Sequence, residues 1–317
     1  MRPLRSAFAG VLLGVLALAG CGQTGTTGGQ TAASATPAAS PGAGFPVTVQ
    51  AGNGTVTIAE RPRRIVSLNP TATENLFAIG AGPQVIAVDD LSNHPKEAPK
   101  TALSGFKPNA EAIIAQKPDL VVLSNDLGGV VAALQKVKVP VLLEPAATKL
   151  AESYDQITDL GAATGNASGA AKVVAGMKEK IEGLAAAAPK DHKLTYYHEL
   201  DVTPYSATSG TFIGEIYGLF GLRNIADEAP DAAGGYPKLS AEFVAKADPD
   251  LIFLADVKCC GQSKKTLAER PGWSGLSAIK NDRVVQLDDD IVSRWGPRAA
   301  EFAQVVADAV AKAAAGG

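Results

Sequence analysis

The chain has 317 residues, of which 46% are hydrophobic and 19% are charged, a composition typical of globular proteins. Its formal net charge is −3, and it becomes −5 when Arg2 and Arg5 are removed, so no polybasic surface for nucleic acid is expected. Aromatic residues make up only 5% of the chain, so an aromatic side chain in a loop is a candidate for ligand contact.

The N-terminus has the pattern of an export signal. Arg2 and Arg5 precede the apolar run 7–18, which is too short to span a membrane as a helix, so residues 1–20 are interpreted as a signal peptide. The run ends in Leu-Ala-Gly-Cys, which resembles a bacterial lipobox and marks Cys21 as the lipidated first residue of the mature chain. The alternative is an ordinary signal peptide with a chance cysteine.

Residues 21–44 follow as a predicted disordered linker. They are almost entirely Gly, Thr, Ser, Ala, Gln and Pro, and such a segment cannot bury enough apolar surface to fold. No later apolar run has the length of a membrane span. We therefore expect a soluble body outside the cytoplasm, anchored to the cell membrane through Cys21.

The first half of the body alternates strands and helices. We expect a hairpin over 46–58, strands at 64–68, 85–88 and 139–143, and helices at 71–80 and 129–138. Between them lies the segment 109–123, which reads as a short helix, a Pro-Asp break and an apolar strand. This alternation predicts a parallel sheet covered by helices in an N-terminal lobe, residues 45–165.

The second half begins with a long helical stretch. Residues 149–188 are expected to be helical with a break at Gly165 and Asn166, so that 166–190 forms a single connecting helix. A new α/β series starts at 194 and ends in a helix over about 297–314. Residues 191–317 are thus predicted to form a C-terminal lobe.

The same phrase occurs in both halves. Residues 109–123 read NAEAIIAQKPDLVVL and residues 240–254 read SAEFVAKADPDLIFL, which align without a gap and place Glu111 and Glu242 at the same position. A weaker echo places Glu74 and Glu215 each six residues before a glycine. A single repeat, about one domain-length away, indicates two similar lobes rather than a solenoid. The predicted fold is therefore α/β, with two Rossmann-like lobes, a ligand cleft between them and one long rigid connecting helix.

From about residue 61 onward the chain resembles a known family. RPRRIVSLNPTATENLFAIGA, the two repeated phrases, DVTPYSATSGTFIGEIYGLFG, GGYPKLSAE and RPGWSGLSAIKNDRVVQLD are similar to the substrate-binding lipoproteins of ABC importers whose lobes are joined by a single helix. Members of that class carry cobalamin, ferric siderophores or haem. Residues 92–95, 203–205 and 293–298 favour the cobalamin-binding branch.

The resemblance implies a function and partners. The expected role is the extracytoplasmic substrate-binding component that captures a metal chelate, with a corrinoid favoured, and delivers it to a permease dimer and its ATPase subunits. A ferric-siderophore or haem carrier is the alternative within the class, and a non-transport sensor or adhesion lipoprotein is the alternative outside it. Closure on the ligand is expected to be small, because a helix resists hinge bending.

The resemblance also assigns the repeated glutamates. By their position in the phrase, Glu111 and Glu242 correspond to the carboxylates that pair with arginines on the transporter. The alternative is that each glutamate only stabilises the first turn of its own helix, an effect of about 0.3–1 kcal/mol. The two roles are compatible.

The ligand is expected between the lobes, at loops after the carboxyl ends of the strands. The aromatic candidates are Phe106, Tyr205, Tyr236 and Trp295, with loop packing as the alternative for each. Arg294 can pair with ligand carboxylates or phosphate, or it can anchor the last helix. His94 can ligate haem iron or the metal of a chelate.

Cys259 and Cys260 are adjacent and fall in one of these loops, so both are candidate ligand contacts. Outside the cytoplasm they can form a vicinal disulfide, and free thiols or a soft-metal site are the alternatives. A protein-held metal site is not expected, because such a site needs about three or four protein ligands and the chain has three histidines.

The sequence does not indicate an enzyme. The G-x-S-x-G and G-x-x-x-x-G-K-[ST] patterns of nucleophile elbows and phosphate loops do not occur. We expect no catalytic residues and no cofactor other than the bound ligand.

Overall fold

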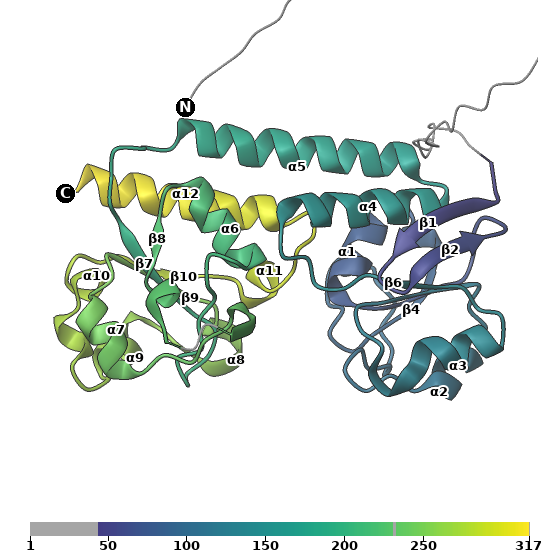
Figure 1. Ribbon diagram of the computed structural model, residues 1–317, viewed down its shortest axis with the longest axis horizontal. Coiled ribbons are helices and arrows are strands. Elements are labelled where there is room, and N and C mark those ends of the chain that lie inside the picture. Colours follow the sequence, from purple (N-terminus) through teal and green to yellow (C-terminus); the bar gives the residue numbers. More distant parts are fainter. Residues whose placement is uncertain (1–43, 231–232, 317) are drawn as a thin grey trace, which may run out of the picture. The chain divides into compact units, whose positions relative to one another are not determined.

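The computed structural model describes residues 44–230 and 233–316. The predicted signal peptide, Cys21 and all of the predicted linker except Gly44 lie outside the described residues. Within the described part, strands and helices alternate and build two parallel four-stranded sheets (Figure 1). This is the predicted α/β architecture. Across these residues, no helix has both the length and the apolar character needed to cross a membrane.

The first sheet has the strand order β4-β3-β5-β6, with all neighbours parallel. Its central strands are buried at every position and aliphatic except for Ser67, as expected where helices cover both faces. The strands are β3 (Ile65–Leu68), β4 (Val85–Val88), β5 (Leu120–Leu123) and β6 (Val141–Leu143). The other elements of this half are the hairpin β1 (Val47–Ala51) and β2 (Gly54–Ile58) and the helices α1 (Pro70–Ala78), α2 (Ala110–Ala115), α3 (Val130–Lys136) and α4 (Leu150–Thr164). We call these elements the first lobe.

The second lobe repeats this topology. Its sheet has the order β8-β7-β9-β10. In this sheet β7 lies between β8 and β9, just as β3 lies between β4 and β5 in the first sheet. The strands are β7 (Thr195–Glu199), β8 (Arg223–Asn224), β9 (Leu251–Leu254) and β10 (Val284–Gln286). The helices are α6 (Phe212–Leu219), α7 (Ala241–Ala247), α8 (Val257–Cys260), α9 (Lys264–Ala268), α10 (Ser277–Lys280), α11 (Asp289–Val292) and α12 (Ala299–Ala315).

A single long helix, α5 (Ala167–Ala187), connects the last elements of the first lobe to β7. The predicted break before it is present, because Gly165 ends α4 in the left-handed conformation with φ 71°. In Figure 1, α5 runs along α4 and α12, and both helices contact it. Helix α5 lies within the predicted connector 166–190, and the bounds of the connector and of the lobes, 45–165 and 191–317, stay a prediction.

The repeated phrase folds in the same way in each lobe. Helices α2 and α7 both begin at the alanine before the repeated glutamate, and strands β5 and β9 both begin at the leucine after the Pro-Asp pair. Lys117 and Asp248, which are equivalent in the repeat, both adopt positive φ, 52° and 43°. The two phrases therefore share backbone conformation as well as sequence.

The aspartate of each Pro-Asp pair joins two strands. Asp119 accepts a hydrogen bond from the backbone nitrogen of Arg64 at 2.8 Å, just before β3. Asp250 accepts one from the backbone nitrogen of Thr195 at 2.8 Å, at the start of β7. The residue after each donor then pairs with the first residue of the strand in the repeated phrase: Ile65 with Leu120, and Tyr196 with Leu251. The similarity between the lobes therefore extends to β3 and β7.

Candidate ligand-binding site

A cavity of about 460 Å³ opens at the carboxyl ends of β3 and β5. In this sheet β4 lies on one side of β3 and β5 on the other, so the chain connections at this edge run to opposite sides of β3. Ligands bind at such topological switch points. Asn69 follows β3, Ser124 and Asn125 follow β5, and all three line the cavity. Phe106 also lines it, with 68% of its surface exposed.

A second cavity of about 320 Å³ opens at the equivalent point of the second lobe. Leu200 follows β7 and Ala255 follows β9, and both line it. The lining is mainly apolar, and Ala146 and Ala147 of the first lobe complete it. The other lining residues are Phe212, Ile213, Tyr236, Cys259, Asp289, Val292, Ser293, Arg294 and Trp295.

The two cavities share one wall, formed by residues 293–295. Trp295 is fixed there by the first lobe, because its Nε1 donates to Gln156 Oε1 at 2.8 Å and its carbonyl accepts from Ser153 Oγ. A ligand in either cavity would therefore meet a tryptophan whose orientation is already set.

Arg294 is not free to bind a ligand charge. Its side chain is 7% exposed, and its guanidinium pairs with Glu74 at 2.6 Å and with Asp290 at 3.0 Å. Arg298 also pairs with Glu74, at 2.6 Å. Of the two roles expected for Arg294, the anchoring contact is the one present, and it joins the lobes through α1.

The two glutamates of the weaker repeat, Glu74 and Glu215, also join the lobes. Glu215 of α6 accepts a hydrogen bond from the backbone nitrogen of Leu150 at 2.6 Å, at the start of α4. The equivalent Glu74 of α1 receives the two arginines from the other side. Each echo glutamate thus fastens its own lobe to the opposite one.

The cavity lining carries more acid than base. Asp89, Asp90 and Asp290 line the first cavity, and Asp289 lines the second. Burial raises the pKa of Asp89, with a hydrogen bond from Ser92 opposing it. Burial also acts to raise the pKa of Asp290, but hydrogen bonds and charges from its basic neighbours outweigh it and the pKa is lowered. Among the described residues that line the two cavities, Arg294 is the only lysine or arginine.

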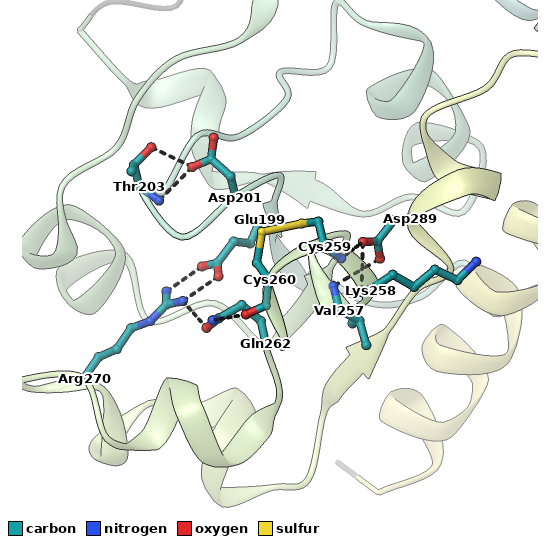
Figure 2. Close-up of a disulfide and its surroundings, with 10 residues drawn as sticks. All are labelled: Glu199, Asp201, Thr203, Val257, Lys258, Cys259, Cys260, Gln262, Arg270 and Asp289. Atoms are coloured by element: carbon teal, nitrogen blue, oxygen red, sulfur yellow. Dashed lines mark hydrogen bonds and ion pairs between the residues drawn. A yellow bond between two sulfur atoms is a disulfide. The ribbon is translucent and has the colours of Figure 1, made fainter. Parts of the chain in front are cut away.

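The two cysteines form a vicinal disulfide (Figure 2). Both residues are exposed, and Cys259 lines the second cavity together with Tyr236. Of the three states that the sequence left open for this pair, the structure has the disulfide. Across the described residues, no group of three or more His, Cys, Asp or Glu is arranged to hold a metal ion.

Three expected site residues do not line these cavities: His94, Tyr205 and Cys260, the last of which is bonded to the lining residue Cys259. His94 is exposed and lines a separate cavity of about 270 Å³ with Phe77 and Pro297. Tyr205 pairs through its backbone with Lys238, whose Nζ lies 5.9 Å from the ring centroid. The sequence places His94 and Tyr205 in loops after strands, but it does not show which way such loops turn.

Sequence reasoning missed several lining residues. Asp89 and Asp90 directly follow β4, and Ser124 and Asn125 directly follow β5, so the strand-end rule could have found them. Phe212 is only 5% exposed, yet it also lines the second cavity.

The repeated glutamates lie in equivalent first turns. Glu111 is in α2, whose N-cap is Asn109, and Glu242 is in α7, whose N-cap is Ser240. Both are exposed, and neither forms an ion pair within the described part of the chain. In Figure 1, α2 and α7 lie at the lower edge of the view, away from α5. Each lobe thus has, in the first turn of one of these helices, an exposed carboxylate without an ion pair among the described residues.

Comparison with known proteins agrees with this geometry. The periplasmic binding protein family matches residues 65–291, which is more than half of the chain. An ABC transporter substrate-binding lipoprotein of Bacillus subtilis, YvrC, is 31% identical over 321 residues, covering 98% of both chains. A vitamin B12-binding protein of Vibrio parahaemolyticus is 28% identical over 256 residues, covering 77% of this chain and 88% of that protein.

A solved structure shows the same fold. The periplasmic vitamin B12 binding protein BtuF of Vibrio cholerae superimposes with a TM-score of 0.68 at 25% identity, covering 80% of this chain and 98% of that one. The chain therefore belongs to the periplasmic binding proteins that serve as substrate-binding components of ABC importers. The predictions of family, fold and extracytoplasmic location are confirmed, as is the prediction of a binding protein rather than an enzyme.

Proposed function

We propose that this protein captures a metal chelate without net negative charge, with a corrinoid favoured, in the cleft between its lobes and hands it to an importer permease. The charge of the cavity lining carries this proposal. Asp89, Asp90 and Asp290 line the first cavity, and Arg294, the one cation among the described residues of the lining, is bonded to Glu74 and Asp290. Lys258, outside the lining, is paired with Asp288 and Asp290.

Anionic chelates fit this lining poorly. Haem carries two propionates and ferric citrate carries further carboxylates, and each would lie beside acids of the protein with no free cation to pair with. Bringing like charges together in a partly buried site is unfavourable. Cyanocobalamin is neutral overall, and the amides at its periphery can exchange hydrogen bonds with Asn69, Asn93 and Asn125.

Apolar surface is available for the face of a large ring. Phe106 contributes it in the first cavity and Tyr236 in the second, and Trp295 lies between them. A planar chelate larger than either cavity would lie across both, over Trp295. Among the described residues no histidine lines either cavity, which further disfavours a haem that needs an imidazole ligand.

A ferric hydroxamate is the second candidate, because such chelates also lack net negative charge. The two candidates and the two disfavoured chelates are separated by equilibrium titration of the full chain with cyanocobalamin, a ferric hydroxamate, haem and ferric citrate. We expect cyanocobalamin to bind most tightly and both anionic chelates at least tenfold more weakly. Tighter binding of haem or ferric citrate contradicts the charge argument.

Delivery is proposed to use Glu111 and Glu242. Both are exposed, occupy equivalent positions and have no ion-pair partner among the described residues, which supports docking to a transporter with two matching basic sites. Exposed ion pairs add little stability but fix register. Cys21 is proposed as the lipidated residue that keeps the protein at the membrane where the permease lies.

The docking proposal is tested with the Glu111→Gln/Glu242→Gln variant. We expect ligand uptake by cells that carry the importer to fall while the Kd for soluble ligand is unchanged. Glu301→Gln is the matched control, because Glu301 is also an exposed glutamate in the first turn of a helix. Uptake equal to wild type in the double variant points to the sensor or adhesion alternative, and an equal loss in the control points to a general helix effect.

A further inference from the structure

The vicinal disulfide forms part of the cavity wall. Cys259 lines the second cavity together with Tyr236 and with residues 293–295, the wall shared by both cavities. In Figure 2 the sulfur–sulfur bond lies above the α8 turn, with Asp289 to its right and the Glu199–Arg270 pair to its left. A ligand in this cavity would therefore meet the disulfide through Cys259.

One side of the turn is fixed to α11. The carboxylate of Asp289 accepts hydrogen bonds from three successive backbone nitrogens, those of Val257 at 3.1 Å, Lys258 at 2.9 Å and Cys259 at 2.9 Å. Asp289 also lies shortly before residues 293–295, the wall shared by the two cavities. The disulfide and that wall are consequently held as one unit.

The other side of the turn is fixed to β7. Gln262 donates to the Cys260 carbonyl at 3.2 Å and accepts from Arg270 at 2.8 Å. Arg270 forms two hydrogen bonds of 2.6 Å with the fully buried Glu199 at the end of β7. The turn thus has anchors on both sides, and neither depends on the sulfur atoms.

The oxidised and reduced pair offer different surfaces. The disulfide of adjacent cysteines closes a small ring through their peptide bond, which removes the rotamer freedom of both side chains before any ligand arrives. In the reduced pair, two unbonded sulfur atoms need more room, and each side chain rotates independently. Because the backbone of the turn is anchored, the added volume and motion must be taken up by the two exposed side chains, of which Cys259 lines the cavity.

We propose that the oxidised Cys259–Cys260 ring is a ligand-contacting wall and that its reduction weakens chelate binding. Reduction by a dithiol proceeds by attack of a thiolate on one protein sulfur, which breaks the protein disulfide and forms a mixed disulfide. The second thiol of the reductant then displaces the cysteine. The protein gains two electrons and two protons as two thiols, and the reductant leaves as its own disulfide. The inference rests on the proposed function for the class of ligand.

The experiment compares the full chain in three states. Wild-type protein is titrated with cyanocobalamin and with a ferric hydroxamate when oxidised, when reduced with a dithiol that is removed under nitrogen before titration, and after reoxidation. The Cys259→Ser/Cys260→Ser variant mimics the reduced pair without any reductant. Dithiol treatment of this variant is the matched control, and thermal melting of each sample confirms that it is folded.

We expect reduction to raise the Kd at least tenfold, about 1.4 kcal/mol, reoxidation to restore it, and the serine variant to match the reduced protein. If oxidised protein binds cyanocobalamin and the reduced protein binds it within twofold, the inference is wrong and the proposed function stands. If only the ferric hydroxamate binds and reduction weakens it tenfold, the corrinoid assignment is wrong and the inference stands. An oxidised protein that binds neither probe contradicts both.

Discussion

The ion pairs of Glu74 give the sharpest test of how the lobes are held together. Glu74 is 3% exposed and accepts hydrogen bonds from Arg294 at 2.6 Å and from Arg298 at 2.8 and 2.6 Å. The Glu74→Gln variant keeps the size of the side chain but removes its charge. Two largely buried guanidinium groups then lose the carboxylate that they share.

Removing one partner of a buried ion pair costs about 3–5 kcal/mol, because the remaining charge stays buried without compensation. Asp290 still pairs with Arg294 at 3.0 Å in the variant, so we expect a loss near the lower end, about 3 kcal/mol. Glu215→Gln is the matched control. Glu215 accepts from the backbone nitrogen of Leu150, and an amide oxygen can still accept that bond, so the loss should be about 1 kcal/mol or less.

The assay is urea unfolding of both variants, followed by the fluorescence of the two tryptophans. Trp273 is fully buried in the second lobe and reports its unfolding, while Trp295 reports the contact between the lobes. The free energies of unfolding of the variants and wild type are compared when their dependence on urea concentration, the slope m, is the same. Equal losses in the two variants, or a loss below about 1 kcal/mol for Glu74→Gln, would refute the view that this cluster fastens the lobes.

The remaining predictions concern pH and packing. Burial lowers the pKa of His198 from 6.5 to about 3, so the folded state loses stability as the pH falls below 6.5. Between pH 7 and pH 5 the free energy of unfolding of His198→Asn should therefore fall by about 2 kcal/mol less than that of wild type. Burial and the charge of Asp159 raise the pKa of Glu144 from 4.5 to about 8, so protonation of Glu144 stabilises the folded state as the pH falls. Over the same interval the free energy of unfolding of Glu144→Gln should therefore fall by about 2–3 kcal/mol more than that of wild type. Urea unfolding at both pH values checks each sign, and an unchanged pH dependence contradicts it. A Cβ at Gly169 of α5 would overlap the carbonyl oxygen of Ile79 at the end of α1, so Gly169→Ala should lower the melting temperature, with a cost of about 1–3 kcal/mol. Gly176→Ala in the same helix meets no atom within 4 Å and should raise stability by about 0.5–1 kcal/mol, and equal shifts in both would contradict the packing argument.

The sequence predicted what depends on local pattern. The repeat between Glu111 and Glu242 predicted two lobes, and the structure keeps the alignment of the two phrases through the strands that end them. Gly165 marked the start of the connecting helix, because a left-handed residue ends a helix. These features depend on periodicity and on residues with special backbone preferences, which are readable without tertiary contacts.

Features that depend on distant contacts were not predictable in the same way. The echo of Glu74 and Glu215 was visible, but its role in joining the lobes required knowing that Arg294 and Leu150 lie opposite them. His94 was expected beside the ligand, and it lines another cavity, because the end of a strand does not fix the direction of a long loop. The acidic lining became visible only when the loops of both lobes were placed together.

The metal chelate is proposed to bind across Trp295, between the lobes. Calorimetric titration of the full chain with cyanocobalamin, compared with its Trp295→Ala variant, tests this proposal most directly. We expect one ligand per wild-type chain and a Kd at least tenfold higher in the variant, about 1.4 kcal/mol. Wild-type protein that binds no cyanocobalamin, or a folded variant that binds it as tightly as wild type, would contradict the claim.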